Sequence, residues 1–329
     1  MDCDASLFFT STSCDFAQMN TAIQTTDSGL MHQPMTGAGD RRDGSLAVAH
    51  SIADGFEILV APPAGQFDLH VSALSAGPDG ENLHKIRVAL RRLRSLWWAY
   101  QPYLNKKEVR AHRREFKALA DAAGQTRDWD ILRQVVAYDE STEYSFKTLI
   151  EDIESRRQDA FMRSRESLER AGAAQLLRKR IDSTLEQLRV QRFEELLPAF
   201  ARRRINDAGK SLDRKFQRAV AHETPEYSEL HDLRIAGKKL RYLLEFFLPV
   251  LDDCDQANIR MLSSLQDELG RVNDLAASEA LLLKHEAEFR DPRQAKSAIC
   301  YVGEQKVHRM QSAYQLLHAV DRMLAIKRA

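Results

Sequence analysis

The sequence HKIRVALRRLR, residues 84–94, places five basic side chains and a histidine within eleven positions and contains no acidic residue. A second stretch, HDLRIAGKKLR at residues 231–241, repeats the histidine, the arginine three positions later and the double-basic step in the same register. The second histidine follows the first by 147 residues. The shared register indicates two related units, and because like charges on one helix face repel, each concentration of charge requires an explanation.

A second pair of matching segments follows the two basic stretches. LADAAGQTRDWDIL (119–132) and LQDELGRVNDLAAS (265–278) align at an offset of 146 residues, matching Leu119 with Leu265, Gly124 with Gly270 and Asp128 with Asp274. Two matches in the same order predict an internal duplication, with halves at about 45–195 and 196–329. In each half we expect the glycine to end one helix in a left-handed turn and the aspartate to cap the next helix.

Length and composition describe an ordinary soluble chain. Its 329 residues are 43% hydrophobic and 29% charged, and the formal net charge is zero, from 48 basic and 48 acidic residues. This balance argues against a general nucleic-acid binder, which carries a positive excess. The four cysteines lack CxxC spacing, the N-terminus lacks a signal-peptide layout, and the apolar runs are too short to span a bilayer. We therefore expect a cytoplasmic protein with free thiols and no membrane contact.

The remaining sequence predicts an all-α protein. Residues 1–44, rich in Ser, Thr, Asp and Gly without periodicity, are expected to form a disordered or loosely attached leader before a helical domain at 45–329. Within 45–80, APPAG (61–65) and SAGPDG (75–80) are expected to break any helix. From Glu81 onward the apolar spacing is helical. Scarce Pro and Gly residues divide this region at about 84–101, 105–123, 128–139, 143–171, 174–195, 199–221, 228–248, 256–290 and 293–326.

Each basic stretch forms a stripe when it is wound into a helix. At about 100° per residue, the basic residues of one repeat fall within about 80° of one another, opposite an apolar face that is expected to be buried. The first stripe contains His84, Arg87, Arg91 and Arg94, and the second contains His231, Arg234, Lys238 and Arg241. Arg92 and Lys239 stand on the shoulders of the stripes.

The two stripes predict a binding surface for a repeating polyanion. A solvated helix face usually mixes signs, yet no carboxylate separates Arg87 from Arg91 on this face. If the halves pack about a pseudo-twofold axis, the stripes face each other across one groove about 15 Å long. Guanidinium and ammonium groups suit phosphate oxygens, and the histidines would gain charge as the pH falls through about 6.5. Weaker candidates for the walls of this groove are Arg156, Arg163, Arg203, Lys210 and Arg214.

The segments LHKIRVALRRLRSL (83–96) and LHDLRIAGKKLRYLLEFF (230–247), each followed by an LxxxxGxxxD element, resemble the two signature helices of the CHAD family, the conserved histidine α-helical domain. The resemblance is strong over about 81–132 and 228–280 and absent before about residue 45. It implies two four-helix bundles around a basic central channel that binds inorganic polyphosphate, in a protein of polyphosphate granules. The triphosphate-tunnel (CYTH) domain that often precedes this domain has an ExExK strand that is missing here, so the chain looks like the stand-alone form.

The same resemblance assigns the polyphosphate-binding residues. Carried over position by position, they are His84, Arg87, Arg91, Arg92, Arg94, His231, Arg234, Lys238, Lys239 and Arg241.

Three alternatives remain in view. A nucleic-acid binder needs exposed aromatic residues among its cations, and only Trp98 qualifies, with Glu245 as its counterpart. ENLH (81–84) matches the ExxH of di-iron bundles, but the second repeat has Ser228 in place of the glutamate. The His-Asp pair at 231–232 resembles that of metal-dependent phosphohydrolases, but the first repeat has Lys85 in place of the aspartate. No nucleophile elbow or phosphate-binding loop is visible. We therefore expect binding without turnover, with no catalytic residue, metal or cofactor.

Overall fold

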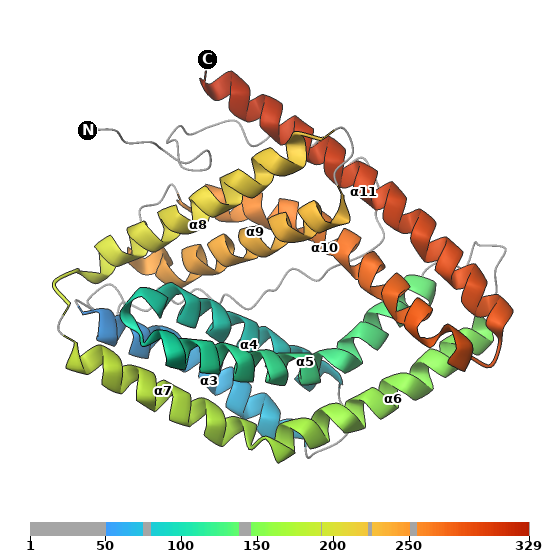
Figure 1. Ribbon diagram of the computed structural model, residues 1–329, viewed down its shortest axis with the longest axis horizontal. Helices are drawn as coiled ribbons and strands as arrows, with labels where there is room; N and C mark the ends of the chain where they lie inside the picture. Colours follow the sequence, from blue (N-terminus) through green and yellow to red (C-terminus); the bar gives the residue numbers. More distant parts are fainter. Residues whose placement is uncertain are drawn as a thin grey trace.

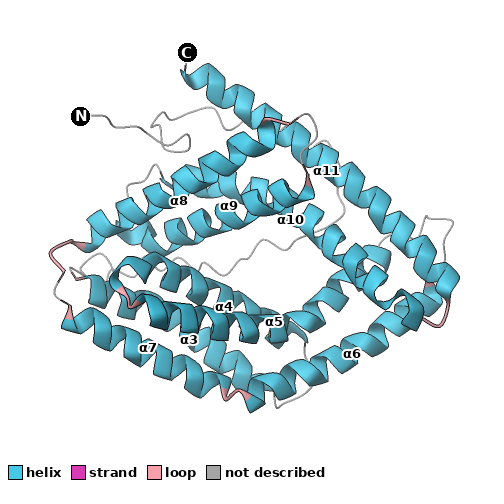
Figure 2. Ribbon diagram, in the orientation of Figure 1, coloured by secondary structure: helices cyan, strands magenta, loops and turns pink. Residues whose placement is uncertain are grey.

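The structure, a computed structural model, describes residues 51–74, 80–137, 146–191, 193–222, 226–250 and 255–328, without the side chains of 255–261 and 323–328. All regular structure in these ranges is helical, which confirms the all-α prediction (Figure 2). The predicted leader, residues 1–44, lies outside the described residues. No helix in the described ranges is long and apolar enough to cross a membrane. The long helices are α3 (Ile52–Ala73), α4 (Gly80–Tyr100), α5 (Lys106–Ala137), α6 (Lys147–Arg170), α7 (Ala173–Val190), α8 (Leu197–Val220), α9 (Tyr227–Phe247), α10 (Asp255–His285) and α11 (Pro292–Arg328).

The expected break at APPAG is wrong, because α3 continues through Pro62 and Pro63. Ser51 begins the helix, and its hydroxyl accepts a hydrogen bond from the amide of Asp54 at 3.0 Å. The apolar face of α3 buries Phe56 and Phe67 completely against the rest of the domain. Each of the two prolines costs about 3 kcal/mol inside a helix, and the buried aromatic and aliphatic side chains of α3, at about 1.5–3 kcal/mol each, offset a loss of that size. Tertiary packing therefore overrides the local signal.

The expected caps at Gly124 and Gly270 are also wrong. α5 runs without interruption through Gly124 and Asp128, and α10 runs through Gly270 and Asp274. Gly124 serves a different purpose, because a Cβ atom at this position would lie 2.5 Å from Nη1 of Arg87. Among the described residues, the one glycine with a positive φ is Gly172, at 53°, and it precedes α7.

The helices form two sets that meet along the basic helices (Figure 1). In one set α4 packs against α3 and α5, and α3 also packs against α7; in the other, α9 packs against α8 and α10. The sets join where α4 contacts α9 and α5 contacts α10. α6 runs along the lower edge of the molecule and packs against α5, whereas α11 runs along the upper right edge and packs against α10 and α8; the two helices meet at the right of the view (Figure 1). The pseudo-twofold relation between the halves stays a prediction.

Two hydrophobic cores hold this arrangement. The larger one lies beneath the basic helices and includes Trp97 and Tyr100 of α4 together with Phe200 and Phe247. Aromatic edges meet within it, with the ring centroids of Phe56 and Trp97 at 5.3 Å. The smaller core joins α5 and α6 to α10 and α11, and it contains Trp129, Leu132, Ile153, Leu282 and Val302. Because α4 and α9 contribute their apolar faces to the larger core, their basic stripes are held away from it.

Candidate anion-binding site

α4 and α9 contact each other through matching positions of the two repeats. On one side, Nη1 of Arg92 lies 3.4 Å from Oε2 of Glu245. On the other, Nζ of Lys239 lies 4.9 Å from the centroid of the Trp98 ring. Arg92 corresponds to Lys239 and Trp98 to Glu245, each at the 147-residue offset of the repeat. The two contacts between α4 and α9 are therefore equivalent under the repeat: one is an ion pair, and the other is a cation–π contact.

This packing brings the two basic stripes together. Burial, followed by the positive charges of Arg91 and Arg234, lowers the pKa of Lys238 to about 6, although Asp274 acts in the opposite direction. Burial also lowers the pKa of Arg234, on which Arg91 and Arg87 act as further positive charges. Arg87 and Arg91 come from α4, and Arg234 and Lys238 come from α9. We refer to these four residues as the central cluster.

Two members of the central cluster are neutralised in part. Nη1 of Arg87 donates to the carbonyl oxygen of Gly124 at 3.3 Å and to Oδ1 of Asp128 at 3.4 Å. Nη1 of Arg234 donates to Oδ1 of Asn273 at 3.3 Å, and the charge of Asp274 acts on the same guanidinium. The predicted stripes therefore carry counter-charges, supplied by α5 and α10.

Arg91 and Lys238 are different. They occupy the same position of the two repeats, and no ion pair found in the described part of the chain includes either of them. Nε of Arg91 and Nε of Arg234 are both buried without a hydrogen-bond partner among the described residues. Unpaired buried charge is destabilising, so the centre of the cluster has unmet capacity for an anion.

The two histidines do not behave alike. Burial, then the charges of Arg127 and other cations, lowers the pKa of His84 to about 4. The expectation that this histidine gains charge near pH 6.5 is therefore wrong, because neighbouring cations oppose its protonation. His231 instead lies with Nδ1 at 3.1 Å from Oδ1 of Asn273, close enough to donate a hydrogen bond. The first repeat has Arg127 at the position that Asn273 occupies in the second repeat. His84 therefore lies near a cation, whereas His231 lies near a neutral hydrogen-bond acceptor.

A second group of cations flanks the central cluster. Burial lowers the pKa of Lys239, and the positive charges of Arg113, Lys215, Arg204 and Arg94 lower it further, in that order. We refer to these five residues as the flanking cations. They come from α4, α5, α8 and α9 and continue the positive field past the end of the stripes. Arg94 lies between the two groups: burial lowers its pKa, and the positive charges of Arg113 and Arg91 lower it further.

Sequence reasoning missed Arg113, Arg127, Arg204 and Lys215, because each lies on a helix other than the two that carry the basic stripes. On α8 the sequence analysis named Arg203, Lys210 and Arg214, which share one face, whereas the flanking cations Arg204 and Lys215 lie on another. Arg204 lies about 100° around that helix from Arg203, and Lys215 lies close to Arg204 in angle. The apolar residues Phe200 and Leu212 share the face of Arg204, and this is the signal that could have identified it.

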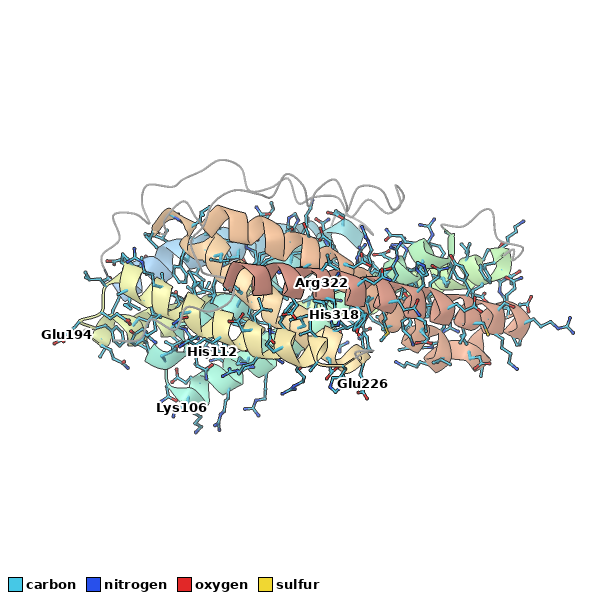
Figure 3. The ribbon with its side chains drawn as sticks, turned by 90° about the horizontal axis from the view of Figure 1, so that it is seen from above. Lys106, His112, Glu194, Glu226, His318 and Arg322 are labelled. Atoms are coloured by element: carbon cyan, nitrogen blue, oxygen red, sulfur yellow. The ribbon has the colours of Figure 1, made fainter. Side chains whose placement is uncertain are left out.

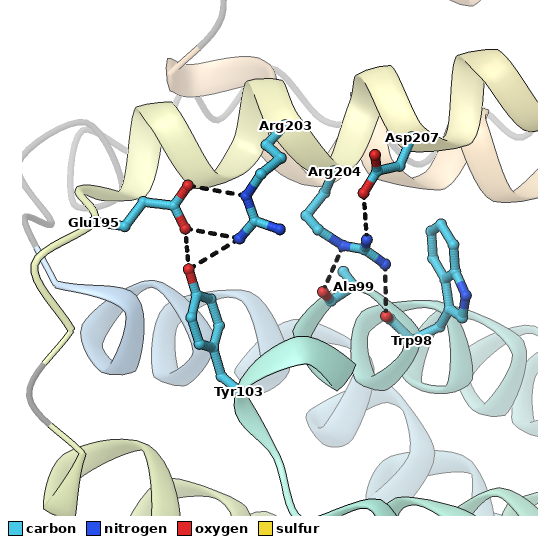
Figure 4. Close-up of polar contacts among 7 residues, drawn as sticks. All are labelled: Trp98, Ala99, Tyr103, Glu195, Arg203, Arg204 and Asp207. Atoms are coloured by element: carbon cyan, nitrogen blue, oxygen red, sulfur yellow. Dashed lines mark hydrogen bonds and ion pairs between the residues drawn. The ribbon is translucent and has the colours of Figure 1, made fainter.

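Arg203 and Arg204 illustrate the difference between the two faces of α8 (Figure 4). Arg203 is bound to Glu195 at 2.7 Å and to the hydroxyl of Tyr103 at 2.9 Å, outside the two groups of cations. Arg204 is buried, and its Nε and Nη2 donate to the carbonyl oxygens of Ala99 and Trp98 at 2.8 and 3.1 Å. It thereby satisfies the last turn of α4, where a cation is also favoured by the helix dipole.

The other weaker candidates lie outside the two groups of cations. Arg156 forms an ion pair with Glu288 at 2.7 Å and lies over the rings of Trp129 and Phe289. It therefore stabilises the smaller hydrophobic core. Arg163, Lys210 and Arg214 are exposed side chains on α6 and α8.

Two further residues named from the sequence, Arg92 and Arg241, have an acidic partner of their own. Glu245 binds Arg92 and also Nε of Arg241, at 3.3 Å. Lys215 of the flanking cations is bound to Asp232 at 2.5 Å. Among the described residues there is no group of three or more His, Cys, Asp or Glu side chains that could hold a metal ion. The unneutralised part of the site is thus narrower than ten basic residues suggest.

Comparison with known proteins agrees with this architecture. The family model "CHAD domain" matches residues 63–283. The chain is similar to the crystal structure of the CHAD domain from the plant Ricinus communis, with 24% identity and a TM-score of 0.68, covering 82% of this chain and 93% of that one. It is also similar to PptA from Streptomyces chartreusis, with 15% identity and a TM-score of 0.57, covering 82% and 99%. The search of curated proteins gives no match. The family model spans most of the chain, and this protein belongs to the CHAD domain family.

Proposed function

We propose that this protein binds inorganic polyphosphate across the central cluster and the flanking cations, without turning it over. One observation carries the proposal. Arg91 and Lys238, one from each repeat, lie close enough for Arg91 to depress the pKa of Lys238, and neither has an ion pair within the described residues. A fold that places two basic groups together without an ion-pair partner loses stability, through repulsion or through deprotonation of the lysine, unless an anion binds them.

The protonation of Lys238 supports an anionic ligand of high charge density. With a pKa of about 6, the amine is mostly neutral at pH 7.5 in the free protein. A bound phosphate chain supplies negative charge beside the amine and raises its pKa, so that Lys238 takes up a proton as the ligand binds. Binding of polyphosphate therefore becomes tighter as the pH falls from about 9 toward 6.

The extent of the site favours a polymer over a single phosphate. From His84 to Arg94 the stripe rises about 15 Å along α4, and the stripe of α9 has the same length. Arg87 and Arg234 also have internal counter-charges with which a single phosphate must compete. A polymer that is held at Arg91 and Lys238 presents its further phosphates at high effective concentration to the remaining cations.

The absence of turnover is part of the proposal. The residues of the central cluster grip phosphate oxygens, and a protonated lysine or an arginine supplies neither a nucleophile nor a base. The neutral amine of free Lys238 is an exception to this rule, but ligand binding removes it by protonation. Incubation with polyphosphate should therefore release no inorganic phosphate above the buffer blank.

We extend the proposal to the cell on the basis of the family. A polyphosphate-binding domain of this kind acts in the cytoplasm, at polyphosphate granules. A fluorescent fusion should co-localise with granules, and the fusion carrying Arg91→Glu and Lys238→Glu should spread through the cell.

A titration series tests the binding proposal. The ligands are polyphosphates of graded length, ATP, inorganic phosphate and a short DNA duplex. We expect polyphosphate to displace DNA at a much lower concentration than the reverse, and affinity to fall steeply with salt. Arg91→Glu with Lys238→Glu should abolish binding and leave helicity intact. The matched control, Lys179→Glu with Lys296→Glu, changes two exposed lysines on α7 and α11 and should bind normally. Wild-type affinity in the first variant would refute the site.

A further inference from the structure

A row of exposed cations along the first half of α5 is not explained by the packing of the fold. Lys106, Lys107, Arg110, Arg113 and Arg114 are all exposed, and Lys117 follows one turn later. At about 100° per residue these six side chains occupy one face of the helix, about 120° wide. Figure 3 shows Lys106 at the outer edge of the molecule, whereas His112 of the same helix lies inside it.

The acidic residues of this segment are turned to the other side of the helix. Glu115 forms an ion pair with Arg180 of α7 at 2.5 Å. Glu108 accepts a hydrogen bond from Gln187, which also belongs to α7. Both carboxylates lie about 180–200° around the helix from Lys106. A solvated face mixes its signs, but this segment separates them, with its acids used for packing and its bases left exposed.

This row of cations begins where the binding site ends. Arg113 is the cation that acts most strongly on Lys239, and it also acts on Arg94. Past Arg113, the chain of positive charge continues through Arg110 to Lys106, over about 10 Å of helix. Asp121 closes the row at its other end, bound to Lys117 at 2.6 Å. The positive field of the site therefore has an open continuation on the outside of the molecule.

We propose that the exposed basic face of α5 extends the polyphosphate site, so that a long chain leaves the central cluster past Arg113 and lies along Lys106, Arg110 and Arg114. This inference rests on the proposed function and adds a preference for long chains. A short chain is held by the central cluster alone. A long chain gains further contacts without a second loss of translational freedom.

The test compares tripolyphosphate with long-chain polyphosphate. In the variant Lys106→Gln, Arg110→Gln and Arg114→Gln, each substitution removes one charge from the exposed row and keeps a helix-forming side chain. We expect about tenfold weaker binding of the long chain, and tripolyphosphate binding within about twofold of wild type. The salt dependence of long-chain binding should also become shallower. The control variant Lys147→Gln, Lys179→Gln and Lys296→Gln removes three exposed charges from α6, α7 and α11 and should bind both ligands normally.

Three results would overturn the inference. The first is unchanged binding of the long chain in the α5 variant. The second is an equal loss for both ligands with a normal melting temperature, because the face would then act by general attraction. The third is a loss of binding to a DNA duplex alone, which would assign the face to nucleic acid. Failure of the proposed function gives a different result, since Arg91→Glu with Lys238→Glu would then still bind tripolyphosphate.

Discussion

Replacing Lys238 by methionine should make the protein more stable while it abolishes polyphosphate binding. The lysine lies in the central cluster beside Arg91 and Arg234, and no ion pair among the described residues neutralises it. Methionine keeps an unbranched aliphatic side chain and removes the amine. The substitution therefore separates the role of Lys238 in binding from its effect on folding.

The magnitude follows from the two pKa values. Lysine titrates at 10.5 in the unfolded chain and at about 6 in the fold, so between these values the unfolded state binds more protons. Stability then rises with pH, and the loss relative to an unshifted lysine is greatest near and below pH 6. At pH 7.5 the lysine must lose its proton as the protein folds. Because this pH lies about 3 units below the unfolded pKa of 10.5, the deprotonation costs about 4 kcal/mol, at about 1.36 kcal/mol per pH unit. We expect Lys238→Met to recover a large part of this.

Urea unfolding of both proteins from pH 7 to pH 9 is the assay. The stability difference between Lys238→Met and wild type should shrink by about 2–3 kcal/mol across this range, because the wild-type lysine needs less deprotonation to fold at high pH. The exposed Lys179→Met on α7 is the control and should show no such trend. The reasoning fails if Lys238→Met is less stable than wild type at pH 7.5, or if the difference between them does not change with pH.

Three further predictions follow from single contacts. Gly124→Ala places a Cβ atom 2.5 Å from Nη1 of Arg87 and should weaken polyphosphate binding several-fold, because it displaces the guanidinium. Gly270→Ala meets open space and should add up to about 1 kcal/mol of helix stability at unchanged affinity. Equal effects of the two substitutions in titration and thermal melting would contradict this. Asp128→Asn removes a carboxylate that lies 3.4 Å from the same guanidinium, and calorimetry should find about twofold to fivefold tighter binding; weaker binding would show that the charge positions Arg87 instead. Burial lowers the pKa of His112, and both ring nitrogens lack a partner within the described residues, so the folded state opposes protonation and wild-type stability should fall as the pH drops below about 6.5. His112→Leu should remove that part of the acid sensitivity in melting curves, and an unchanged pH profile would refute the assignment.

Much of the fold was predictable because its signals are local. Helical spacing of apolar residues identified α4 and α9 and their buried faces, and Leu90, Leu93, Leu233 and Leu240 are all fully buried. The errors lie where distant packing overrides a local signal. Pro62 looked like a helix break, but its helix gains enough from burial to continue.

The candidate site was predictable in part for the same reason. The periodic cations of one helix can be read from its own sequence, whereas Arg113 and Arg204 enter the site only because α5 and α8 pack beside α4 and α9. The apolar spacing of α8 does place Arg204 on the buried face, with Phe200 and Leu212, and Arg203 outside it, but it does not show that this face lies against the cations of α9. The lowered pKa of His84 was out of reach for a related reason, because it depends first on burial in the packed structure and then on Arg127 from another helix.

The sequence by itself determined the helical class, the two basic stripes and their shared register, since these depend on side chains three and four positions apart. Only the tertiary structure decided that the stripes meet, that Arg91 and Lys238 have no ion pair within the described residues, and that the cations of α5 are exposed on the outside of the molecule. Charge–charge energies depend on distance and burial, and both are set by how helices far apart in the chain come to pack against each other.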